Sequence, residues 1–364
     1  MKKKQIIFFL ANFGQGGAGK SIVRICNRLN RKKFDIAVMC LKKCYYKNEL
    51  IQNNIEVIEI NKERVFFSKN EIKKNINYYL KKNKKIIFVS NLFYSNAIIS
   101  LFLKKNNNFK LIFSERTPFQ ELNTYFDFVD FIKKLIIKLI LKINYKKANL
   151  IIANSKKTAE DIKKFSGKNV LCIYSPSFKN AIDHKKKIHK KIRLLSVGRL
   201  SKEKNYYVLI NYLSKINNIE FSLKIVGDGP EKNKLIQFIK KNNLNKKIKI
   251  LSFKNNLKKY FIEADLFISP SKFEGFPNSV VEAISYNIPV LSSKSHGGIN
   301  EILRSKNYGL LYDTNSFYSF ESNLKYFIKN REMFVFSKKN VEKNFKNFTV
   351  KACSMSYKKI FEKI

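Results

Sequence analysis

Histidine is scarce in this chain of 364 residues, and long apolar runs are missing altogether. Three histidines leave little room for a histidine-based metal site, so we predict no bound metal. The five cysteines show neither metal-ligand nor disulfide spacing, which indicates reduced thiols in the cytosol. No stretch reaches the roughly 18 consecutive apolar residues typical of a membrane-spanning helix, so none is predicted.

Acidic residues are also few, because 27 aspartates and glutamates face 73 lysines and arginines, a formal net charge of +46. Such an excess attracts nucleic acid, anionic membranes or phosphate-rich ligands. The basic residues are spread over the whole length, and no RNA-binding motif or aromatic-basic platform accompanies them, which argues against nucleic acid. AT-biased codon usage offers a second explanation, since lysine, asparagine and isoleucine are enriched together. Among macromolecular partners, the charge therefore favours an anionic membrane surface.

A glycine-rich loop follows the apolar run at residues 5–10, which is too short for a signal peptide and which we interpret as the first strand. Residues 14–21, with the sequence GQGGAGKS, satisfy the phosphate-binding P-loop pattern G-x-x-x-x-G-K-S. A P-loop nucleoside triphosphatase is therefore an alternative function. Such an enzyme also needs an acid at a strand end to hold magnesium. Glu115 is the only tolerable candidate, although the usual residue is aspartate.

Short apolar runs alternate with helical patterns along the first half of the chain. The predicted strands are 35–41, 55–60, 85–89, 110–114, 149–153 and 169–173, and the predicted helices lie near 69–82, 94–104, 126–145 and 155–166. Buried strands separated by helices predict a parallel, doubly wound α/β sheet, in which ligands bind at the carboxyl ends of the strands. This architecture places Gly16, Gly17 and the segment 114–117 at the ligand-binding edge.

The stretch 266–303 predicts a second site of this kind. A short strand leads into a loop that contains Glu274, and a helix is predicted to begin near Ser279, with Asn278 or Ser279 as its N-cap and Glu282 about one turn inside. The free N–H groups and partial positive charge of a helix start suit a phosphate or diphosphate. The two flanking carboxylates can accept hydrogen bonds from sugar hydroxyls. As isolated charges they would be ordinary surface residues, but the surrounding proline, glycine and N-cap pattern favours a site.

The segment PSKFEGFPNSVVEAISYNIPVLSS resembles the donor-binding segment of the retaining, nucleotide-sugar-dependent glycosyltransferases of family 4, also called group 1. The resemblance covers most of the chain and is stronger in its second half. It implies the GT-B architecture, an α/β fold in which two doubly wound, Rossmann-like parallel-sheet domains face each other across a cleft. Glu274 and Glu282 match the E-x7-E pair of that family. The match implies that Glu282 binds the donor ribose and Glu274 the hydroxyls of the donor sugar.

Two further motifs are similar to those of the same family. Residues 198–204 (GRLSKEK) fit the pattern G-R-L-x-x-x-K, which implies that Arg199 and Lys204 bind the donor diphosphate. Because negative charge grows on the leaving diphosphate, two fixed cations and a helix start would stabilise it without a metal. Gly16 and Gly17 match a Gly-Gly-Ala segment that faces the diphosphate across the cleft. The resemblance implies catalytic roles for Glu274, Arg199 and Lys204, and donor binding by these three together with Gly16, Gly17, Gly198, Gly275, Phe276, Asn278, Ser279 and Glu282.

The segment Ser114-Glu115-Arg116 resembles a stretch found in part of this family. The resemblance makes Glu115 and Arg116 candidates for the acceptor side of the site. A strand-end turn held by an ion pair explains the same residues, and the sequence does not decide between the two.

Changes in composition predict the domain boundaries. Residues 1–174 form the expected acceptor-binding domain, and 192–337 the expected donor-binding domain. Residues 175–191 lose periodicity and gain proline, serine and lysine, which indicates a linker. The helical tail 338–364 is expected to cross back to the first domain, as the last helix of GT-B proteins does.

The predicted helix 126–145 combines a broad apolar face with lysines at every fourth position, namely Lys134, Lys138 and Lys142. Two interpretations are open. The helix packs on the sheet with its lysines in solvent, or it lies on a bilayer with its apolar face inserted and its lysines on lipid phosphates. The apolar face is wider than sheet packing needs, which speaks for the bilayer.

Together, the resemblance and these patterns predict a retaining, metal-independent hexosyltransferase that uses a nucleotide sugar, expected to be a UDP-sugar, and no cofactor. It would move a hexose or N-acetylhexosamine to a glycan acceptor, expected to be lipid-linked. The expected process is bacterial surface polysaccharide synthesis, such as that of capsule or lipopolysaccharide. The expected location is cytoplasmic and peripheral, on the inner face of the cytoplasmic membrane, with an anionic membrane surface but no nucleic acid as partner.

Overall fold

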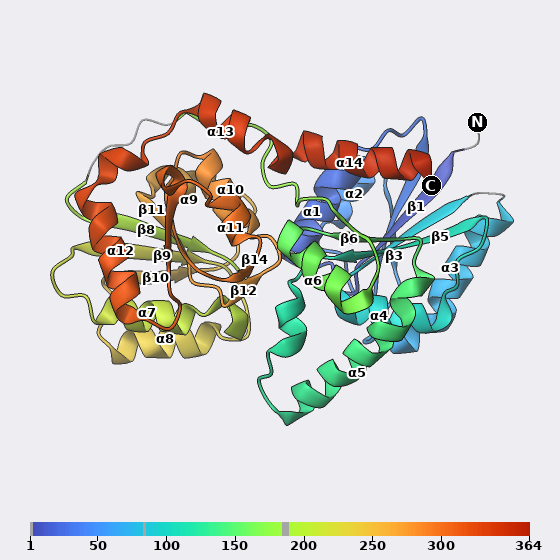
Figure 1. The fold of residues 1–364 in the computed structure, drawn as a ribbon, viewed down its shortest axis with the longest axis horizontal. Helices are drawn as coiled ribbons and strands as arrows, with labels where there is room; N and C mark the ends of the chain where they lie inside the picture. Colours follow the sequence, from blue (N-terminus) through green and yellow to red (C-terminus); the bar gives the residue numbers. More distant parts are fainter. Residues whose placement is uncertain (1–2, 83–84, 184–188) are drawn as a thin grey trace. The chain divides into compact units, whose positions relative to one another are not determined.

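The computed structural model describes residues 3–82, 85–183 and 189–364, and the chain divides into two compact units (Figure 1). The first unit consists of Met1–Pro176 and Val350–Ile364, and the second of Ser177–Thr349. Each unit contains a parallel sheet covered by helices. The prediction of an α/β fold with two doubly wound, Rossmann-like domains is therefore confirmed.

A parallel sheet forms the centre of the first unit. Within the described residues, its seven strands lie in the order β3-β2-β1-β4-β5-β6-β7, and all of the paired ladders are parallel. The strands are β1 (Lys4–Phe9), β2 (Phe34–Cys40), β3 (Glu56–Glu59), β4 (Ile86–Asn91), β5 (Phe109–Glu115), β6 (Leu150–Ala153) and β7 (Val170–Cys172). The carboxyl ends of these strands consequently meet at one edge of the sheet.

Helices cover both faces of this sheet, which is why its strands are apolar almost throughout. In β1, successive side chains enter different cores: Ile6 and Phe8 pack with α1 and α14, whereas Ile7 and Phe9 pack with α3, α4 and α5. The helices are α1 (Gly17–Cys26), α2 (Lys47–Gln52), α3 (Lys69–Lys81), α4 (Phe93–Phe102), α5 (Phe128–Asn144), α6 (Lys156–Ser166) and α14 (Val350–Lys363), with the 3-10 turns η1 (Val65–Ser68), η2 (Phe119–Asn123) and η3 (Tyr145–Lys147).

The second unit repeats this architecture around a sheet of order β10-β9-β8-β11-β13-β15. Its strands are β8 (Ile192–Val197), β9 (Phe221–Val226), β10 (Ile248–Leu251), β11 (Leu266–Ser269), β13 (Val290–Ser293) and β15 (Gly309–Tyr312), with a small ladder of β12 (Phe273–Glu274) and β14 (His296–Gly297). Its helices are α7 (Tyr206–Ser214), α8 (Lys232–Lys241), α9 (Lys258–Glu263), α10 (Asn278–Ser285), α11 (Ile299–Ile302), α12 (Phe317–Lys329) and α13 (Lys338–Asn344), with the 3-10 turns η4 (Lys202–Lys204), η5 (Lys306–Tyr308), η6 (Arg331–Phe334) and η7 (Lys346–Phe348). No helix in the described ranges is both long enough and apolar enough to pass through a membrane.

The segments predicted to join the two domains belong to the units themselves. Residues 177–183 of the predicted linker lie in the second unit, where Ile182 N donates a hydrogen bond to Ser285 O over 2.7 Å. The predicted linker also includes 184–188, which lie outside the described residues. The tail 338–364 consists of two helices, of which α13 belongs to the second unit and α14 packs on α1 in the first.

Three lysines of helix α5 contact groups of their own unit, and one of the three is buried. The buried Lys134 donates from Nζ to Asp130 Oδ2 over 2.6 Å, and Lys138 contacts the Tyr125 hydroxyl over 3.2 Å. Lys142 Nζ donates to a backbone carbonyl of α6 over 2.5 Å. One interpretation of the helix placed these lysines in solvent, and the other placed them on lipid phosphates. For Lys134 both are wrong, because its ammonium group is buried in an ion pair with Asp130.

Candidate functional site

The carboxyl ends of two neighbouring strands carry most of the predicted site residues of the second unit. Strand β8 ends at Val197 and leads through Gly198 and Arg199 into η4, while its neighbour β11 ends at Ser269 and leads into β12. Because the two strands run parallel, their following loops emerge at the same edge of the sheet. The two loops therefore meet, although they are far apart in the sequence.

The backbone around Glu274 is fixed by the small parallel ladder between β12 and β14, in which Glu274 is paired with Gly297. Gly297 has a φ of +116°, and a side-chain carbon there would lie 1.7 Å from the carbonyl oxygen of Glu274. Only glycine is compatible with both constraints. Gly298 N donates to the carbonyl oxygens of Glu274 and Gly275 over 3.3 and 3.1 Å. The position of Glu274 is thus determined by backbone contacts.

The Glu274 carboxylate joins the two loops. Lys204 Nζ, from η4, forms an ion pair with Oε1 of Glu274, and Ser271 Oγ donates to the same oxygen over 2.8 Å. Both members of the pair are largely enclosed, with side chains 22% and 15% exposed for Lys204 and Glu274. The structure therefore brings together two of the three residues that the sequence predicted as catalytic.

Arg199, the third predicted catalytic residue, is more exposed and is held by a neighbour on η4. Its Nη2 forms an ion pair with Glu203 Oε1 over 2.9 Å, and Ser201 Oγ donates to the same carboxylate oxygen over 2.5 Å. Burial favours the neutral form of Glu203, but the hydrogen bonds from Ser201 and Arg199 outweigh it and hold the pKa of Glu203 below its ordinary value. The anionic Glu203 thus orients the Arg199 guanidinium.

Two loop backbones pack directly against each other beside Arg199. A side-chain carbon at Gly227, after β9, would lie 1.9 Å from the carbonyl oxygen of Gly198, so glycine is needed for this close approach. Leu200 N donates to the carbonyl oxygen of Asp228 over 2.9 Å. The loop that carries Arg199 and Lys204 therefore rests on the turn after β9, which limits its freedom to move.

Helix α10 begins at Asn278, four residues after Glu274. Pro277 occupies the N-cap position and makes no side-chain hydrogen bond to the helix, so the predicted cap by Asn278 or Ser279 is wrong. Asn278 Oδ1 instead accepts a hydrogen bond from Ser177 Oγ over 2.9 Å. Because no cap side chain covers this helix start, its partial positive charge stays available to an anion.

Of the remaining donor-side candidates, one packs in the interior of the second unit and two lie on helix α10. Phe276 is buried and packs edge-on against Phe348 of η7, with ring centres 4.9 Å apart, so its side chain serves the core of the second unit. Ser279 and Glu282 are three residues apart on α10 and so share one of its faces. Glu282 is the more enclosed of the two, at 9% exposure.

In the first unit, the predicted glycine pair forms the start of α1. Gly16 is the N-cap of this helix, and Gly17 is its first residue. Both are exposed, and a side-chain carbon added to Gly16 would meet no atom within 4 Å. The backbone of this loop is therefore accessible to an approaching phosphate.

Glu115 and Arg116, the acceptor-side candidates, both lie inside the first unit. The Glu115 carboxyl is fully buried, and its Oε1 accepts hydrogen bonds from Asn96 Nδ2 over 2.7 Å and from the Tyr145 hydroxyl over 2.8 Å. Burial raises the pKa of Glu115 to about 8, although these two hydrogen bonds act in the opposite direction. Arg116 is also buried and donates from Nε to Asn91 Oδ1 over 2.9 Å. This placement favours a structural role for both residues.

The position of Glu115 also decides the P-loop alternative. A P-loop hydrolase holds magnesium with an acid at a strand end, and the sequence offers Glu115 alone for that task. A carboxyl group that is fully buried, and whose Oε1 accepts hydrogen bonds from Asn96 and Tyr145, is not placed to coordinate a metal ion beside residues 14–21. The P-loop hydrolase interpretation is therefore not supported.

Sequence reasoning missed the residues that hold the predicted ones in place. Ser271 lies three positions before Glu274, and Glu203 four positions after Arg199, so each is close in the sequence to the residue that it holds. Those spacings could have pointed to both. Gly297 gave no local signal, because the carbonyl group that it approaches belongs to a strand distant in sequence.

The loops after β8 and β11, together with α10, carry groups whose chemistry suits a diphosphate and a sugar. Arg199 and Lys204 supply two cations, the start of α10 supplies N–H groups, and Glu274 supplies a carboxylate for hydroxyl groups. In the described part of the chain, no cluster of three or more histidine, cysteine, aspartate or glutamate side chains is arranged to hold a metal ion.

Comparison with known sequences finds relatives for both halves of the chain. The family model described as "Glycosyl transferases group 1" matches residues 178–346. Over 341 residues, the chain is 28% identical to the N-acetylgalactosamine-N,N'-diacetylbacillosaminyl-diphospho-undecaprenol 4-alpha-N-acetylgalactosaminyltransferase of Campylobacter jejuni, covering 87% of this chain and 88% of that protein. It is also 31% identical over 134 residues to the amylovoran biosynthesis glycosyltransferase AmsD of Erwinia amylovora, covering 37% of this chain and 38% of that protein.

Solved structures match the fold over nearly the whole chain. Alr3699/HepE of Anabaena, determined in complex with UDP, has a TM-score of 0.76 at 17% identity and covers 99% of this chain and 100% of its own. The sucrose-phosphate synthase of Thermosynechococcus elongatus has a TM-score of 0.81 at 15% identity and covers 99% of both chains. At these identities the likeness concerns the fold.

Proposed function

We propose a reaction for this chain from the premise that it belongs to the group 1, or family 4, glycosyltransferases, whose fold is GT-B. The chain transfers an N-acetylhexosamine or a hexose from a UDP-sugar to a lipid-linked glycan, with retention of configuration and without a metal. The observation that carries this proposal is the Lys204–Glu274 ion pair at the ends of β8 and β11, because a lysine can neutralise a diphosphate and a carboxylate can accept hydrogen bonds from sugar hydroxyls.

The names of related proteins support the choice of donor and acceptor. The Campylobacter relative is named for N-acetylgalactosaminyl transfer onto a glycan on diphospho-undecaprenol, with an alpha linkage. UDP-N-acetylgalactosamine is itself an α-glycoside, so an α-linked product corresponds to retention. The Anabaena neighbour of similar fold binds UDP. A UDP-N-acetylhexosamine and a lipid-linked acceptor are therefore the first pair to test.

The chemistry follows from the charges at the site. The bond between the anomeric carbon and the diphosphate oxygen breaks, and negative charge grows on the diphosphate. Arg199, Lys204 and the start of α10 stabilise that charge, and fixed groups do so without reorganisation. The acceptor hydroxyl forms its bond to the anomeric carbon on the face that the diphosphate leaves, and its proton passes to the departing diphosphate oxygen. Glu274 orients the sugar through its hydroxyls, and Glu282 binds the ribose.

The acceptor also defines where the chain works. A glycan on a lipid diphosphate is held at a membrane surface, and nucleotide sugars are made in the cytosol. We therefore place the chain at the cytoplasmic face of the membrane as a peripheral protein. The amylovoran and undecaprenol relatives support a role in making a bacterial surface polysaccharide, such as capsule or lipopolysaccharide.

A donor panel tests this proposal. The purified chain is incubated with UDP-N-acetylgalactosamine, UDP-N-acetylglucosamine, UDP-glucose, and GDP- and ADP-sugars, each with an undecaprenyl-diphosphate-linked glycan and with or without EDTA. We expect one UDP-sugar to give a product whose new linkage is α by NMR, at the same rate with EDTA. A β linkage would refute retention, and a loss of rate with EDTA would refute metal independence. A preference for a GDP-sugar or an ADP-sugar would refute the assignment of a UDP-sugar as donor.

A further inference from the structure

The outer face of α5, in the first unit, presents apolar side chains that the donor site does not use. Most of them are three or four residues from the next, and Leu135 and Ile136 are adjacent, so they lie in one stripe along the helix. This outer stripe consists of Phe128, Ile132, Leu135, Ile136, Leu139 and Ile143. Phe128, at one end of the helix, is 76% exposed, and Ile143, at the other end, is 61% exposed. Apolar surface is thus left uncovered along the whole length of α5.

The opposite face of α5 accounts for its packing on the first unit. Ile137 and Leu141 are buried in the core that α4 and α5 share. Asp127 caps the helix by accepting a hydrogen bond from Asp130 N over 2.8 Å, and the pair of Asp130 with the buried Lys134 closes the inner face. Since this inner face completes the packing, contacts with the described residues of the first unit do not explain the apolar outer stripe.

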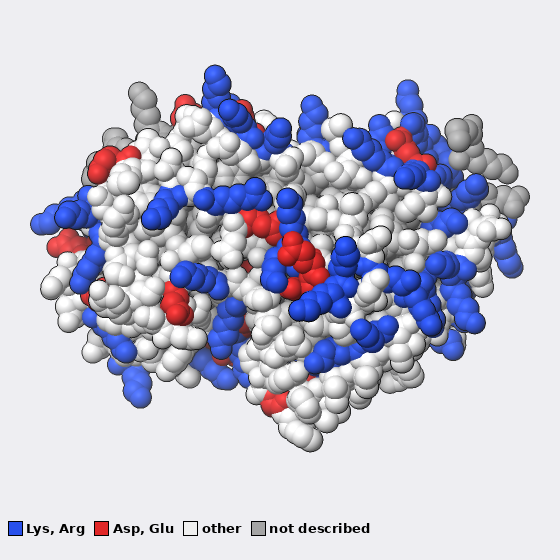
Figure 2. Space-filling view, viewed as in Figure 1, with Lys and Arg blue, Asp and Glu red and all other residues white. Residues whose placement is uncertain are grey.

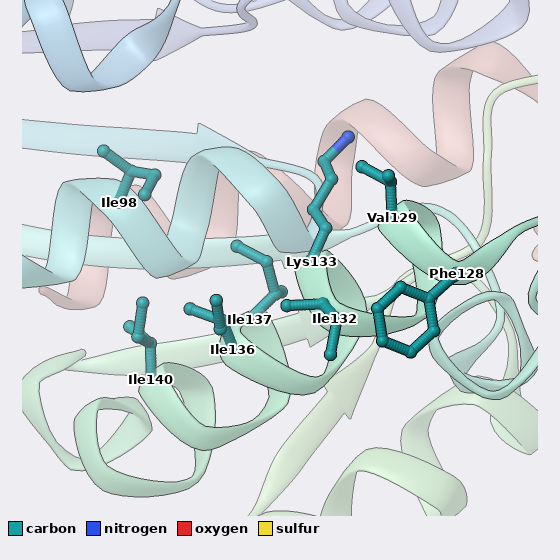
Figure 3. A pocket seen from close by; sticks show the side chains of 8 residues that line it. All are labelled: Ile98, Phe128, Val129, Ile132, Lys133, Ile136, Ile137 and Ile140. Carbon is teal, nitrogen blue, oxygen red and sulfur yellow. The ribbon is translucent and has the colours of Figure 1, made fainter.

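The outer stripe continues onto neighbouring elements. Ile98 of α4 lies across a groove of about 420 Å³ from it, and the lining is apolar apart from Lys133 (Figure 3). Ile98 also lines a second hollow, of about 360 Å³, together with Phe66 and Phe67 of η1. Both phenylalanines are more than half exposed. Lys69 and Asn70 also line this second hollow, so the uninterrupted apolar surface is that of α5 and Ile98, and an exposed apolar patch of this kind marks an interaction site.

Charged residues border the outer stripe but do not enter it. At roughly 100° of turn per residue, Lys138 and Lys142 lie along one edge of the stripe and Lys133 along the other. Figure 2 shows the surface over α5 as mainly white, with lysine and arginine side chains near its border. An apolar stripe edged by lysines is the pattern of helices that lie in the plane of a membrane interface.

We propose that the outer stripe docks this chain on an anionic lipid bilayer, with α5 lying among the headgroups. The chain carries a net charge of +46, so a second copy on this face would add strong repulsion, whereas an anionic bilayer neutralises the charge. This inference deepens the proposed function, since a lipid-linked acceptor lies at such a surface. Its test, however, measures vesicle binding and does not depend on sugar transfer.

The chain contains no tryptophan, so single tryptophans report on chosen positions. Phe128→Trp and Leu139→Trp place the probe on the outer stripe. Ile51→Trp is the matched control, because Ile51 is an exposed apolar residue of α2, which packs on the opposite face of the same sheet. Vesicles contain equal parts of phosphatidylglycerol and phosphatidylcholine, with or without brominated acyl chains. We expect vesicles to shift the emission of the two stripe probes to the blue, brominated chains to quench it, and neither effect at Ile51→Trp.

A polar variant of the stripe tests whether it is needed for binding. The triple substitution Ile132→Ser, Leu139→Ser and Ile143→Ser alters exposed side chains only, so the thermal unfolding temperature should stay close to that of the wild type. We expect its flotation with the same vesicles to be weaker by about tenfold or more. The control triple substitution Ile51→Ser, Tyr78→Ser and Met355→Ser changes equally exposed positions on other helices, and its flotation should match the wild type.

Each alternative outcome contradicts the docking proposal. Wild-type protein that fails to float with anionic vesicles at low salt would overturn it, and so would bound protein whose stripe probes stay unquenched. A blue shift of Phe128→Trp that grows with protein concentration in the absence of lipid would assign the stripe to a second copy of the chain. The proposed function fails separately, since stabilisation by UDP is measured without vesicles and depends on residues of the second unit.

Discussion

At the residue scale, the central feature is one carboxylate oxygen with two donors. Lys204 and Ser271 both bond to Oε1 of Glu274, so the lysine is held in place by groups from another loop. A cation that is already fixed stabilises a developing charge without the cost of moving, which is the main source of electrostatic catalysis. The pair is therefore a unit rather than two separate contributions.

Substitutions in this pair test that interpretation. We expect Lys204→Met and Glu274→Gln each to lower kcat/KM roughly 100-fold or more, because the proposed reaction uses both groups on the sugar diphosphate. The double variant should lose much less than the product of the two single losses. Initial rates of the wild type, the two single variants and the double variant complete the double-mutant cycle. Lys202→Met, an exposed lysine of the same 3-10 turn, serves as the control and should retain wild-type rates. Strictly additive losses would show that the two residues act independently.

Glu115 gives a second prediction at this scale, on stability and pH. In the unfolded chain its carboxyl ionises at its ordinary pKa of 4.5, whereas the folded chain keeps the proton until about pH 8. The folded state therefore loses stability relative to the unfolded state as the pH rises through this window. Glu115→Gln has no proton to lose, so its free energy of unfolding should gain roughly 3–5 kcal/mol on the wild type between about pH 5 and pH 8. Urea unfolding of both proteins at the two pH values measures this gain. A difference in the free energy of unfolding that is the same at both pH values would contradict a buried, protonated Glu115.

At the element scale, the small ladder of β12 and β14 positions the site. This ladder is only two residues long on each side, and it depends on the close approach of Gly297 to the Glu274 carbonyl group. The remaining strands provide the edge of the sheet, but this pair sets the direction in which the carboxylate points. A change in its backbone should therefore affect both stability and transfer.

A matched pair of glycine substitutions separates this effect from a general loss of flexibility. Gly297→Ala forces a side chain onto a φ of +116° and into the Glu274 carbonyl oxygen, so we expect a loss of roughly 2 kcal/mol or more in the free energy of unfolding. Gly16→Ala meets no atom within 4 Å and has an extended φ of −164°, so its effect should be under about 1 kcal/mol. Chemical denaturation of both variants decides, and equal losses would refute the role assigned to Gly297.

The sequence predicted elements better than it predicted their partners. The apolar runs and turn signals located the strands and helices within a few residues, since their periodicity is local. The orientation of Lys134 was not accessible in this way, because its partner Asp130 could equally have pointed to solvent. The burial of Glu115 depends on Asn96 and Tyr145, which the fold brings together from other elements. The predicted N-cap of α10 was wrong for a related reason, because the side chain of Asn278 accepts a hydrogen bond from Ser177, which is distant in the sequence.

At the scale of the whole molecule, the two units have separate cores, and Arg199, Lys204 and Glu274, which the proposed function assigns to the donor, all lie in the second. Independent cores give separate unfolding transitions, and a ligand stabilises the unit that binds it. Calorimetry should therefore show two transitions. At about a hundred times its Kd, UDP should stabilise the second unit by about 2.7 kcal/mol and move its transition more than that of the first. The transition whose temperature changes in Glu115→Gln is that of the first unit, because Glu115 lies there. An equal shift of both transitions by UDP would contradict independent unfolding of the two units.

The division of the chain also affects its synthesis. Helix α14 completes the first unit by placing Tyr357 and Phe361 against Phe8, with ring centres 6.4 and 6.0 Å apart. A ribosome that has made residues 1–176 has not yet made this helix, so the nascent first unit lacks the contacts of α14 with Phe8 while the whole of Ser177–Thr349 is translated. The second unit is continuous in sequence and can reach its native state during that interval. Folding thus finishes in the reverse of the order in which the two units emerge, and the first unit is the one whose apolar surface stays exposed for longer during synthesis.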